Sequence, residues 1–261
     1  MTAARAGEPR VEGPETMNPL IRKLERFTRL SDADKRLLQQ AASARIVNYD
    51  THQDIIAEGE EPCDVNLILA GWVCRYKQLA DGSRQIMSFL LPGDLCDLNI
   101  FLLSRMDHAL GTLTPVTVAK ISRDLLDRML NADPRLTRAL WWEVLVTAAI
   151  HREWLVNIGR RSALERVAHL LCEIFVRQQA VGRVKDDRCE LPVTQAELAD
   201  ALGLSAVHVN RTLRELRQSG LIDWRDKSLV LPDLDALTAL ARFDPDYLHL
   251  DHEGERFEAG A

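Results

Sequence analysis

Polar and basic side chains gather on one face of the segment from Ala206 to Leu216. Val209, Leu213 and Leu216 recur at three- and four-residue spacing, which is typical of the buried face of a helix. An arginine on the opposite face can donate two hydrogen bonds to guanine O6 and N7, and Asn or His can bond base edges or phosphate oxygens. The chemistry predicted for that face is contact with double-stranded DNA.

Two neighbouring elements would position this helix. Thr194 followed by Glu197 predicts a capping box at the start of a preceding helix, Gly203 predicts a sharp turn, and Ser205 can cap the second helix. Residues 221–231, with a polar tip at 225–228 between apolar flanks, predict a hairpin. Together they predict a winged helix-turn-helix. The candidate DNA-contacting residues are Thr194, Gln195, Ser205, Ala206, Val207, His208, Asn210, Arg211 and Arg214.

The charge distribution agrees with a DNA partner. The chain carries a net charge of −6, but residues 135–231 hold 15 basic and 12 acidic side chains. Local charge matters more than the total for attraction to phosphates. No apolar run approaches the ~20 residues needed to span a bilayer, and no signal peptide pattern opens the chain. We therefore expect a cytoplasmic protein with no membrane partner.

Short apolar runs separated by turns dominate the first half of the chain. A helical stretch over residues 19–42 precedes them, and glycine turns punctuate them. Their even spacing predicts a small β-barrel. The expected strands are residues 45–49, 54–57, 65–70, 72–78, 84–91 and 117–121.

Residues 135–158 predict one long helix with two apolar stripes. The first repeats in the alternating three- and four-residue steps of a two-stranded coiled coil, and comprises Leu140, Val144, Thr147, His151, Trp154 and Ile158. The neighbouring stripe comprises Trp141, Leu145, Ala148 and Leu155. One stripe would face the β-barrel and the other a second subunit, and the sequence leaves open which. A hinge is expected at residues 157–161, around Gly159.

From about Leu24 to Leu240 the chain resembles the CRP/FNR family of bacterial transcription regulators. The resemblance implies an α+β fold with an N-terminal β-roll sensor, a long dimerisation helix and a C-terminal winged helix-turn-helix. It also implies a homodimer that binds a palindromic DNA site and contacts RNA polymerase. The expected divisions are a disordered extension (1–18), the β-roll (19–133), the dimerisation helix and hinge (134–159), the DNA-binding domain (160–241) and an acidic tail (242–261), interpreted as a loose end.

The sequence does not identify the molecule that binds the sensor domain. Relatives that bind cyclic AMP hold it with a Gly-Glu pair and an Arg-Ser pair after the Gly-Asp turn. Here that segment has no Gly-Glu, and His108-Ala109 stands where Arg-Ser is expected. A cyclic phosphate needs a fixed cation, so we expect no cyclic AMP binding in the usual mode. The alternative is a divergent pocket in which Arg105 takes the role. The candidate pocket residues are Gly93, Asp94, Cys96, Asp97, Arg105 and His108.

Cysteine usage argues against redox cofactors. Five cysteines include no CxxC pair, and none precedes Cys63, whereas oxygen-sensing relatives carry an N-terminal cluster for an iron–sulfur centre. Cys96 and His108 could share a metal or haem with Asp97 or Asp107. The interpretation we favour instead is that Cys96 is a buried free thiol and His108 a polar loop histidine. We expect no cofactor and no metal.

The recognition segment departs from its relatives at one position. Relatives that read the common half-sites have Glu where this chain has Val207, and Arg where it has Arg211. Since Val can contact only a thymine methyl, the half-site should keep a guanine opposite Arg211 and otherwise differ. Two rival classes remain. An enzyme is disfavoured because no nucleophile with an adjacent base and no phosphate loop appears, and a helix-turn-helix that binds only protein is disfavoured by the outward arginines.

Overall fold

The computed structural model describes residues 18–98, 100–251 and 254. Two helices open the described part, α1 (Pro19–Leu24) and α2 (Asp32–Ser43). The sequence predicted a single helical stretch over residues 19–42; the structure divides it, because Ser31 caps α2 through a reciprocal capping box with Asp34. The predicted disordered extension lies, except for residue 18, outside the described residues.

The sensor domain is a β-roll of two four-stranded antiparallel sheets, in the orders β1-β8-β3-β6 and β2-β7-β4-β5. All six predicted strands are present, and two short ones, β6 and β7, were missed. Gly71 explains one tight turn, since it has φ of +84° and a Cβ there would lie 2.2 Å from the carbonyl oxygen of Pro115. The strands are β1 (Ile46–Tyr49), β2 (Asp54–Ile56), β3 (Asp64–Ala70), β4 (Val73–Gln78), β5 (Arg84–Leu90), β6 (Leu95–Cys96), β7 (Ala109–Thr112) and β8 (Val116–Ser122).

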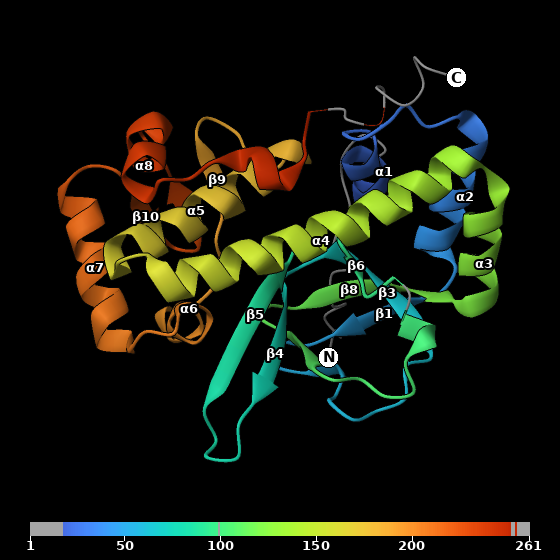
Figure 1. Cartoon of the computed structure of the whole chain (residues 1–261), viewed down its shortest axis with the longest axis horizontal. Helices are drawn as coiled ribbons and strands as arrows, with labels where there is room; N and C mark the ends of the chain where they lie inside the picture. The colour runs from blue at the N-terminus through green and yellow to red at the C-terminus, as the bar shows by residue number, and fades with distance from the viewer. Residues whose placement is uncertain (1–17, 99, 252–253, 255–261) are drawn as a thin grey trace, which may run out of the picture.

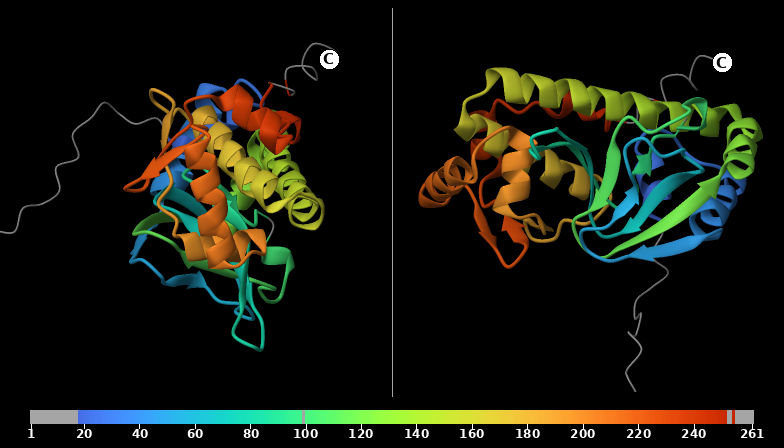
Figure 2. Two further views of the ribbon diagram at one scale, coloured as in Figure 1. Left: turned by 90° about the vertical axis from the view of Figure 1, so that its left-hand side faces the viewer. Right: turned by 90° about the horizontal axis from the view of Figure 1, so that it is seen from below.

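A short 3-10 turn, η1 (Ile100–Leu102), follows β6, and α3 (Arg123–Ala132) leads from the roll into the long helix α4 (Pro134–Arg160). Its 27 residues give a length of about 40 Å. Asp133 caps its start and Pro134 occupies the first turn, where proline is tolerated. Helix α4 runs past both the β-roll and the C-terminal domain (Figures 1 and 2).

The C-terminal domain begins where α4 breaks. The predicted hinge was centred on Gly159, but α4 continues through Gly159 and Arg160, and the extended residue is Arg161. Ser162 and Glu165 then form a capping box that starts α5 (Ala163–Ala180). The break therefore lies at residues 161–162, because the new cap ends one helix and starts the next.

After α5 come β9 (Arg188–Glu190), α6 (Gln195–Leu202), α7 (Ala206–Gln218), β10 (Asp223–Arg225), β11 (Ser228–Val230), α8 (Leu234–Ala241) and η2 (Pro245–Leu248). Helix α5 packs against α7 and α8, and the wing strands form a three-stranded sheet, β10-β11-β9. The interpretation of the chain after residue 242 as a loose end is wrong for residues 243–248. Phe243 and Leu248 are buried, and the Tyr247 ring stacks on His169.

Among the described residues, none of the helices combines the length and the apolar character that crossing a membrane requires.

Candidate DNA interface and sensor cavities

The turn between α6 and α7 forms as the sequence predicts. Thr194 Oγ1 accepts from the Glu197 backbone N–H at 3.2 Å, and the Glu197 carboxylate accepts from the Thr194 backbone N–H at 2.6 Å. Gly203 ends α6 in the left-handed conformation, with φ of +62°. Ser205 caps α7 by accepting from the His208 backbone N–H at 3.2 Å. These local bonds fix the start of α7 relative to α6.

Helix α7 has the two faces that its spacing predicts. Val209, Leu213 and Leu216 are fully buried, and Thr212 is buried beside them. On the other face Ala206, Val207, Arg211 and Arg214 are exposed, while His208 and Asn210 are half-buried. Val207 exposes 82% of its surface. A bulky apolar side chain so exposed in a capped, rigid helix is available to touch a partner.

Two of the polar candidates are held in place by each other. Asn210 Nδ2 donates to Gln195 Oε1 at 3.0 Å, so the amide of α7 is oriented by the first residue of α6. The Arg214 guanidinium lies 3.5 Å from Asn210 Oδ1. In the described part of the chain, Arg211 has neither a hydrogen bond nor an ion pair, and its guanidinium keeps its donors for an external acceptor.

The wing is a two-residue hairpin. Asp226 and Lys227 at its tip both have positive φ, 48° and 64°, as a type I′ turn requires. Leu229 of β11 is fully buried and pairs with Cys189 of β9, the third strand that the sequence did not reveal. The wing tip therefore extends from a sheet that is anchored in the core. Asp226 and Lys227 line the same surface cavity as Gln195 of α6 and Arg217 of α7.

The predicted pocket residues fall into different environments. Asp97 and His108 line cavities between the β-roll and α4. Cys96 is buried in β6, where burial raises the pKa of its thiol. Arg105 is exposed on the loop after η1, so it does not supply the cation of a pocket. Gly93 forms a tight turn against Pro19, and its neighbour Asp94 lies in a separate ion-pair network.

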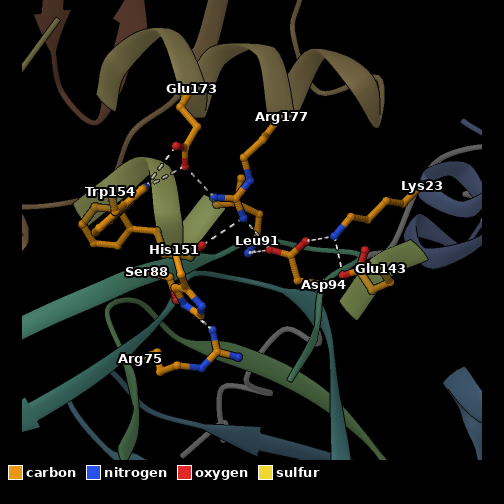
Figure 3. Close-up of polar contacts among 11 residues, drawn as sticks. Lys23, Arg75, Ser88, Leu91, Asp94, Glu143, His151, Trp154, Glu173 and Arg177 are labelled. Atoms are coloured by element: carbon orange, nitrogen blue, oxygen red, sulfur yellow. Dashed lines mark hydrogen bonds and ion pairs between the residues drawn. The ribbon is translucent and has the colours of Figure 1, made fainter. Parts of the chain in front are cut away.

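A residue that the sequence did not single out organises the site. Arg75 of β4 is 3% exposed, and its Nη2 lies 3.0 Å from Asp97 Oδ1. Its Nη1 donates to Ser88 Oγ at 2.9 Å and lies 3.4 Å from His151 Nε2 (Figure 3). Its Nε donates to His108 Nε2 at 3.1 Å. The expectation that the site lacks a fixed cation is wrong; the cation is present, but a carboxylate of the protein already pairs with it.

Titration behaviour follows from this cluster. Burial alone would raise the pKa of Asp97, but Arg75 and His108 outweigh it and lower that pKa. Burial, and after it the charge of the neighbouring Arg75, lowers the pKa of His151 to about 4. His151 is therefore uncharged at neutral pH and can accept from Arg75. The second carboxylate, Asp107, lies 2.7 Å from His108 Nδ1.

Two cavities open around these residues. The smaller, about 200 Å³, is lined by Asp97, Leu98, His108, Glu143, Val144 and Thr147, among others. The larger, about 530 Å³, is lined by Arg75, Ile86, His108, His151, Trp154 and Leu155, among others. Both include Asp97, Asp107 and His108. Within residues 18–98, 100–251 and 254, no group of three or more His, Cys, Asp or Glu side chains is arranged to hold a metal ion.

The sequence left open which stripe of α4 faces a second subunit, and burial separates the two. Leu140 and Trp154 of the first stripe are buried inside the chain, so neither can face a second subunit. Val144, Thr147, His151 and Ile158 are half-buried. The neighbouring stripe is open instead: Trp141 is 50% exposed, Leu145 62% and Leu155 74%.

A β-roll joined by a long helix to a winged helix-turn-helix defines a class of protein, the DNA-binding regulator with a cyclic-nucleotide-binding type of sensor domain. The family model for the cyclic nucleotide-binding domain matches residues 46–133, and that for the Crp-like helix-turn-helix domain matches residues 165–240.

Similar proteins are transcription regulators. A "Probable transcriptional activator" of Rhizobium leguminosarum bv. viciae is 31% identical over 185 residues, 70% of this chain and 76% of the relative. The nitrogen fixation regulation protein FixK of Bradyrhizobium diazoefficiens is 30% identical over 197 residues, 76% of this chain and 82% of the relative. The structure of FixK2 from Bradyrhizobium japonicum matches with a TM-score of 0.67 and 27% identity, covering 75% of this chain and 96% of that one. The chain belongs to the CRP/FNR family of transcription regulators.

Proposed function

We propose that this regulator acts as a homodimer on a palindromic DNA site in the cytoplasm, under the control of an effector in the β-roll, and that it is not an enzyme. The observation that carries the DNA assignment is α7 itself. It is capped at its start, buried along Val209, Leu213 and Leu216, and presents Val207, Arg211 and Arg214 outward. Such a helix can enter a major groove without rearranging.

Each exposed residue has a role that fits its chemistry. Arg211 has an unengaged guanidinium that can donate to both O6 and N7 of a guanine. Val207, four residues earlier on the same face, can contact a thymine methyl. Three further candidates, Thr194, Gln195 and Ser205, lie at helix starts, where free backbone N–H groups favour phosphate oxygens. The half-site would thus contain a guanine opposite Arg211 and a thymine opposite Val207.

Dimerisation rests on the accessible stripe of α4. Trp141, Val144, Ala148, His151, Leu155 and Ile158 alternate in four- and three-residue steps, and all six are exposed or half-buried. This is the spacing of a two-stranded coiled coil. Compared with the first stripe expected from the sequence, it keeps residues 144, 151 and 158 and has 141, 148 and 155 in place of 140, 147 and 154. Burying such a stripe against a copy of itself would place two recognition helices about a two-fold axis.

The effector proposal follows from charge. Arg75, the buried cation of the larger cavity, already contacts Asp97, Ser88 and His108. The smaller cavity is lined by three carboxylates, Asp97, Asp107 and Glu143, and by neither Lys nor Arg among its described lining residues. An incoming cyclic phosphate would meet acceptors rather than free donors. We propose an effector that is uncharged or cationic, with an apolar body. The absence of a cofactor stays a prediction.

Relatives named as transcriptional activators support contact with RNA polymerase as the output, and we propose that partner for this chain too.

Selection of DNA from a random pool tests the DNA proposal. Purified protein should enrich an inverted repeat whose half-sites lie about 10–11 base pairs apart. The matched variant Arg211→Ala should enrich the same repeat without its guanine. Enrichment of an asymmetric site, or none at low ionic strength, would contradict the proposal.

Calorimetry tests the effector proposal separately. Cyclic AMP and cyclic GMP should give no binding at micromolar concentration. Asp97→Ala, which frees Arg75, should gain affinity for these anions. Micromolar binding of either nucleotide to the unchanged protein would overturn the proposal.

A further inference from the structure

Five charged side chains gather where the β-roll, α4 and the C-terminal domain meet (Figure 3); the three carboxylates are buried and the two basic side chains are half-buried. We call them the interdomain clamp: Lys23, Asp94, Glu143, Glu173 and Arg177. They come from α1, the turn between β5 and β6, α4 and α5. Asp94 was predicted to line the effector pocket, but the structure places it at the centre of this clamp.

Asp94 receives donors from both domains. Its Oδ1 lies 2.5 Å from Lys23 Nζ, and its Oδ2 lies 2.8 Å from Arg177 Nη2. The same oxygen accepts from the Leu91 backbone N–H at 2.7 Å. Burial alone would raise the pKa of Asp94, but Lys23 and Arg177 lower it to about 2. Asp94 is therefore a charged anchor that belongs to the sensor domain.

Arg177 connects that anchor to the DNA-binding domain. It lies on α5, and besides Asp94 it donates to the carbonyl oxygen of Phe89 at 2.9 Å and pairs with Glu173 at 3.2 Å. Glu173 is fully buried and accepts from Trp154 Nε1 and the Tyr247 hydroxyl. One guanidinium thus joins the sensor sheet to a network that includes α4 and η2.

Further contacts join the sensor domain to the DNA-binding domain. Arg26, in the turn that follows α1, donates to the carbonyl oxygen of Ala180, the last residue of α5, at 3.1 Å. On the other side of the domain, Arg84 of β5 pairs with Asp200 of α6 at 2.8 Å. Because α7 packs on both α5 and α6, its direction relative to the sensor depends on these contacts.

A buried ion pair contributes little net stability compared with apolar packing, but it demands one geometry, since a misplaced partner leaves a charge buried and unpaired. The clamp is therefore suited to fixing orientation. It also reaches the effector site, because Lys23 lies 2.5 Å from Glu143, a residue that lines the smaller cavity.

We propose that the Asp94–Arg177 pair is a positioning contact that fixes the winged helix on the sensor domain and so sets the half-site spacing that the dimer accepts. The proposal rests on the proposed function, because spacing has meaning only for two recognition helices on a palindrome. While Arg177 is paired with Asp94, α7 holds one direction relative to the sensor domain, and the two recognition helices of the dimer fit one half-site spacing. Without that pair, the DNA-binding domain turns at the break at residues 161–162, and the dimer accepts several half-site spacings.

The test compares DNA affinities of purified full-length variants on duplexes that share half-sites and differ in spacing by two base pairs. The unchanged protein should discriminate by about tenfold or more. Arg177→Met should bring that ratio below about threefold, and Arg177→Lys should restore part of it. Arg177→Met is expected to fold, since Asp94 keeps Lys23 and Glu173 keeps Trp154 and Tyr247.

Leu237→Ala is the matched control. Leu237 is fully buried in α8, which packs on α5, so its truncation destabilises the domain without touching the clamp. It should lower the amount of active protein and leave the spacing ratio unchanged. Asp94→Asn removes the same ion pair from the sensor side and should flatten the ratio as Arg177→Met does, with no further change in the double variant.

An unaltered ratio in Arg177→Met or in Asp94→Asn, measured on whichever variant folds, would overturn the positioning role. If both variants have the circular dichroism spectrum of an unfolded chain, the positioning role is also overturned, and the ion pair has a purely structural role. If the unchanged protein shows no preference between spacings, the homodimer on a palindrome is what fails.

Discussion

Leu155 offers the sharpest test of the dimer. Its side chain is 74% exposed on α4, in the accessible apolar stripe. Complete burial of a leucine is worth ~1.5–3 kcal/mol, so burial of the exposed three quarters should contribute about 1–2 kcal/mol per subunit. A two-fold axis repeats the contact, which gives about 2–4 kcal/mol for the dimer.

Leu155→Gln should therefore raise the dimer dissociation constant by about 30- to 700-fold, at about tenfold per 1.4 kcal/mol. Sedimentation equilibrium over a concentration series measures this directly. Glutamine keeps helix propensity, so the thermal midpoint of the monomer should not fall. Leu79→Gln is the control, because Leu79 is similarly exposed, at 59%, but lies in the β4–β5 hairpin. An equal dissociation constant for Leu155→Gln and the unchanged protein would refute the assignment of this stripe.

Three further changes have defined outcomes. Val207→Glu replaces an apolar contact by an acceptor, so selected sites should gain a C·G pair opposite that residue, worth about 1–3 kcal/mol; an unchanged consensus would argue against Val207 reading a base. Thr194→Ala removes the capping box of α6 and should lower the free energy of unfolding by about 0.5–2 kcal/mol in a urea titration, whereas no loss would mean that the cap contributes nothing. The pKa of His151 is lowered to about 4 in the folded protein, so between pH 6.5 and 4 the unfolded chain binds more protons than the folded one. The free energy of unfolding therefore decreases as the pH is lowered through this range, by at most about 1.4 kcal/mol per pH unit. His151→Gln should reduce that slope, and an identical slope would contradict the burial of a neutral imidazole.

The DNA-binding half could be predicted because its signals are local. The caps at Thr194 and Ser205, the glycine at 203 and the spacing of the apolar residues in α7 all act within a few residues of one another. The missed strand, β9, has three residues and pairs with a strand about forty residues away. Nothing in so short a segment distinguishes a strand from a loop.

The sensor site depended on contacts between distant residues. Arg75 lies in a strand that was predicted, but a strand pattern does not say that Asp97 and His108 will pack against that arginine. Asp94 was assigned to the pocket because it follows Gly93, whereas Lys23 and Arg177, 71 and 83 residues away in the sequence, draw it into the clamp.

In helix α4 the spacing of apolar residues likewise could not show which face packs on the core. The stripe through Leu140 and Val144 and the neighbouring stripe through Trp141 and Leu145 have the same spacing and are offset by one residue, which is about 100° around the helix axis. Only the packing of Trp154 against Phe89 and Glu173 shows which stripe faces the core.

The placement of α7 in the major groove is tested most sharply by the affinity of Arg211→Ala for the selected palindrome, measured by fluorescence anisotropy at a stated salt concentration. This variant should lose about 1–3 kcal/mol per half-site and should lose the preference for guanine at one base pair. Wild-type affinity together with wild-type base preference in this variant would contradict the placement of α7 in the major groove.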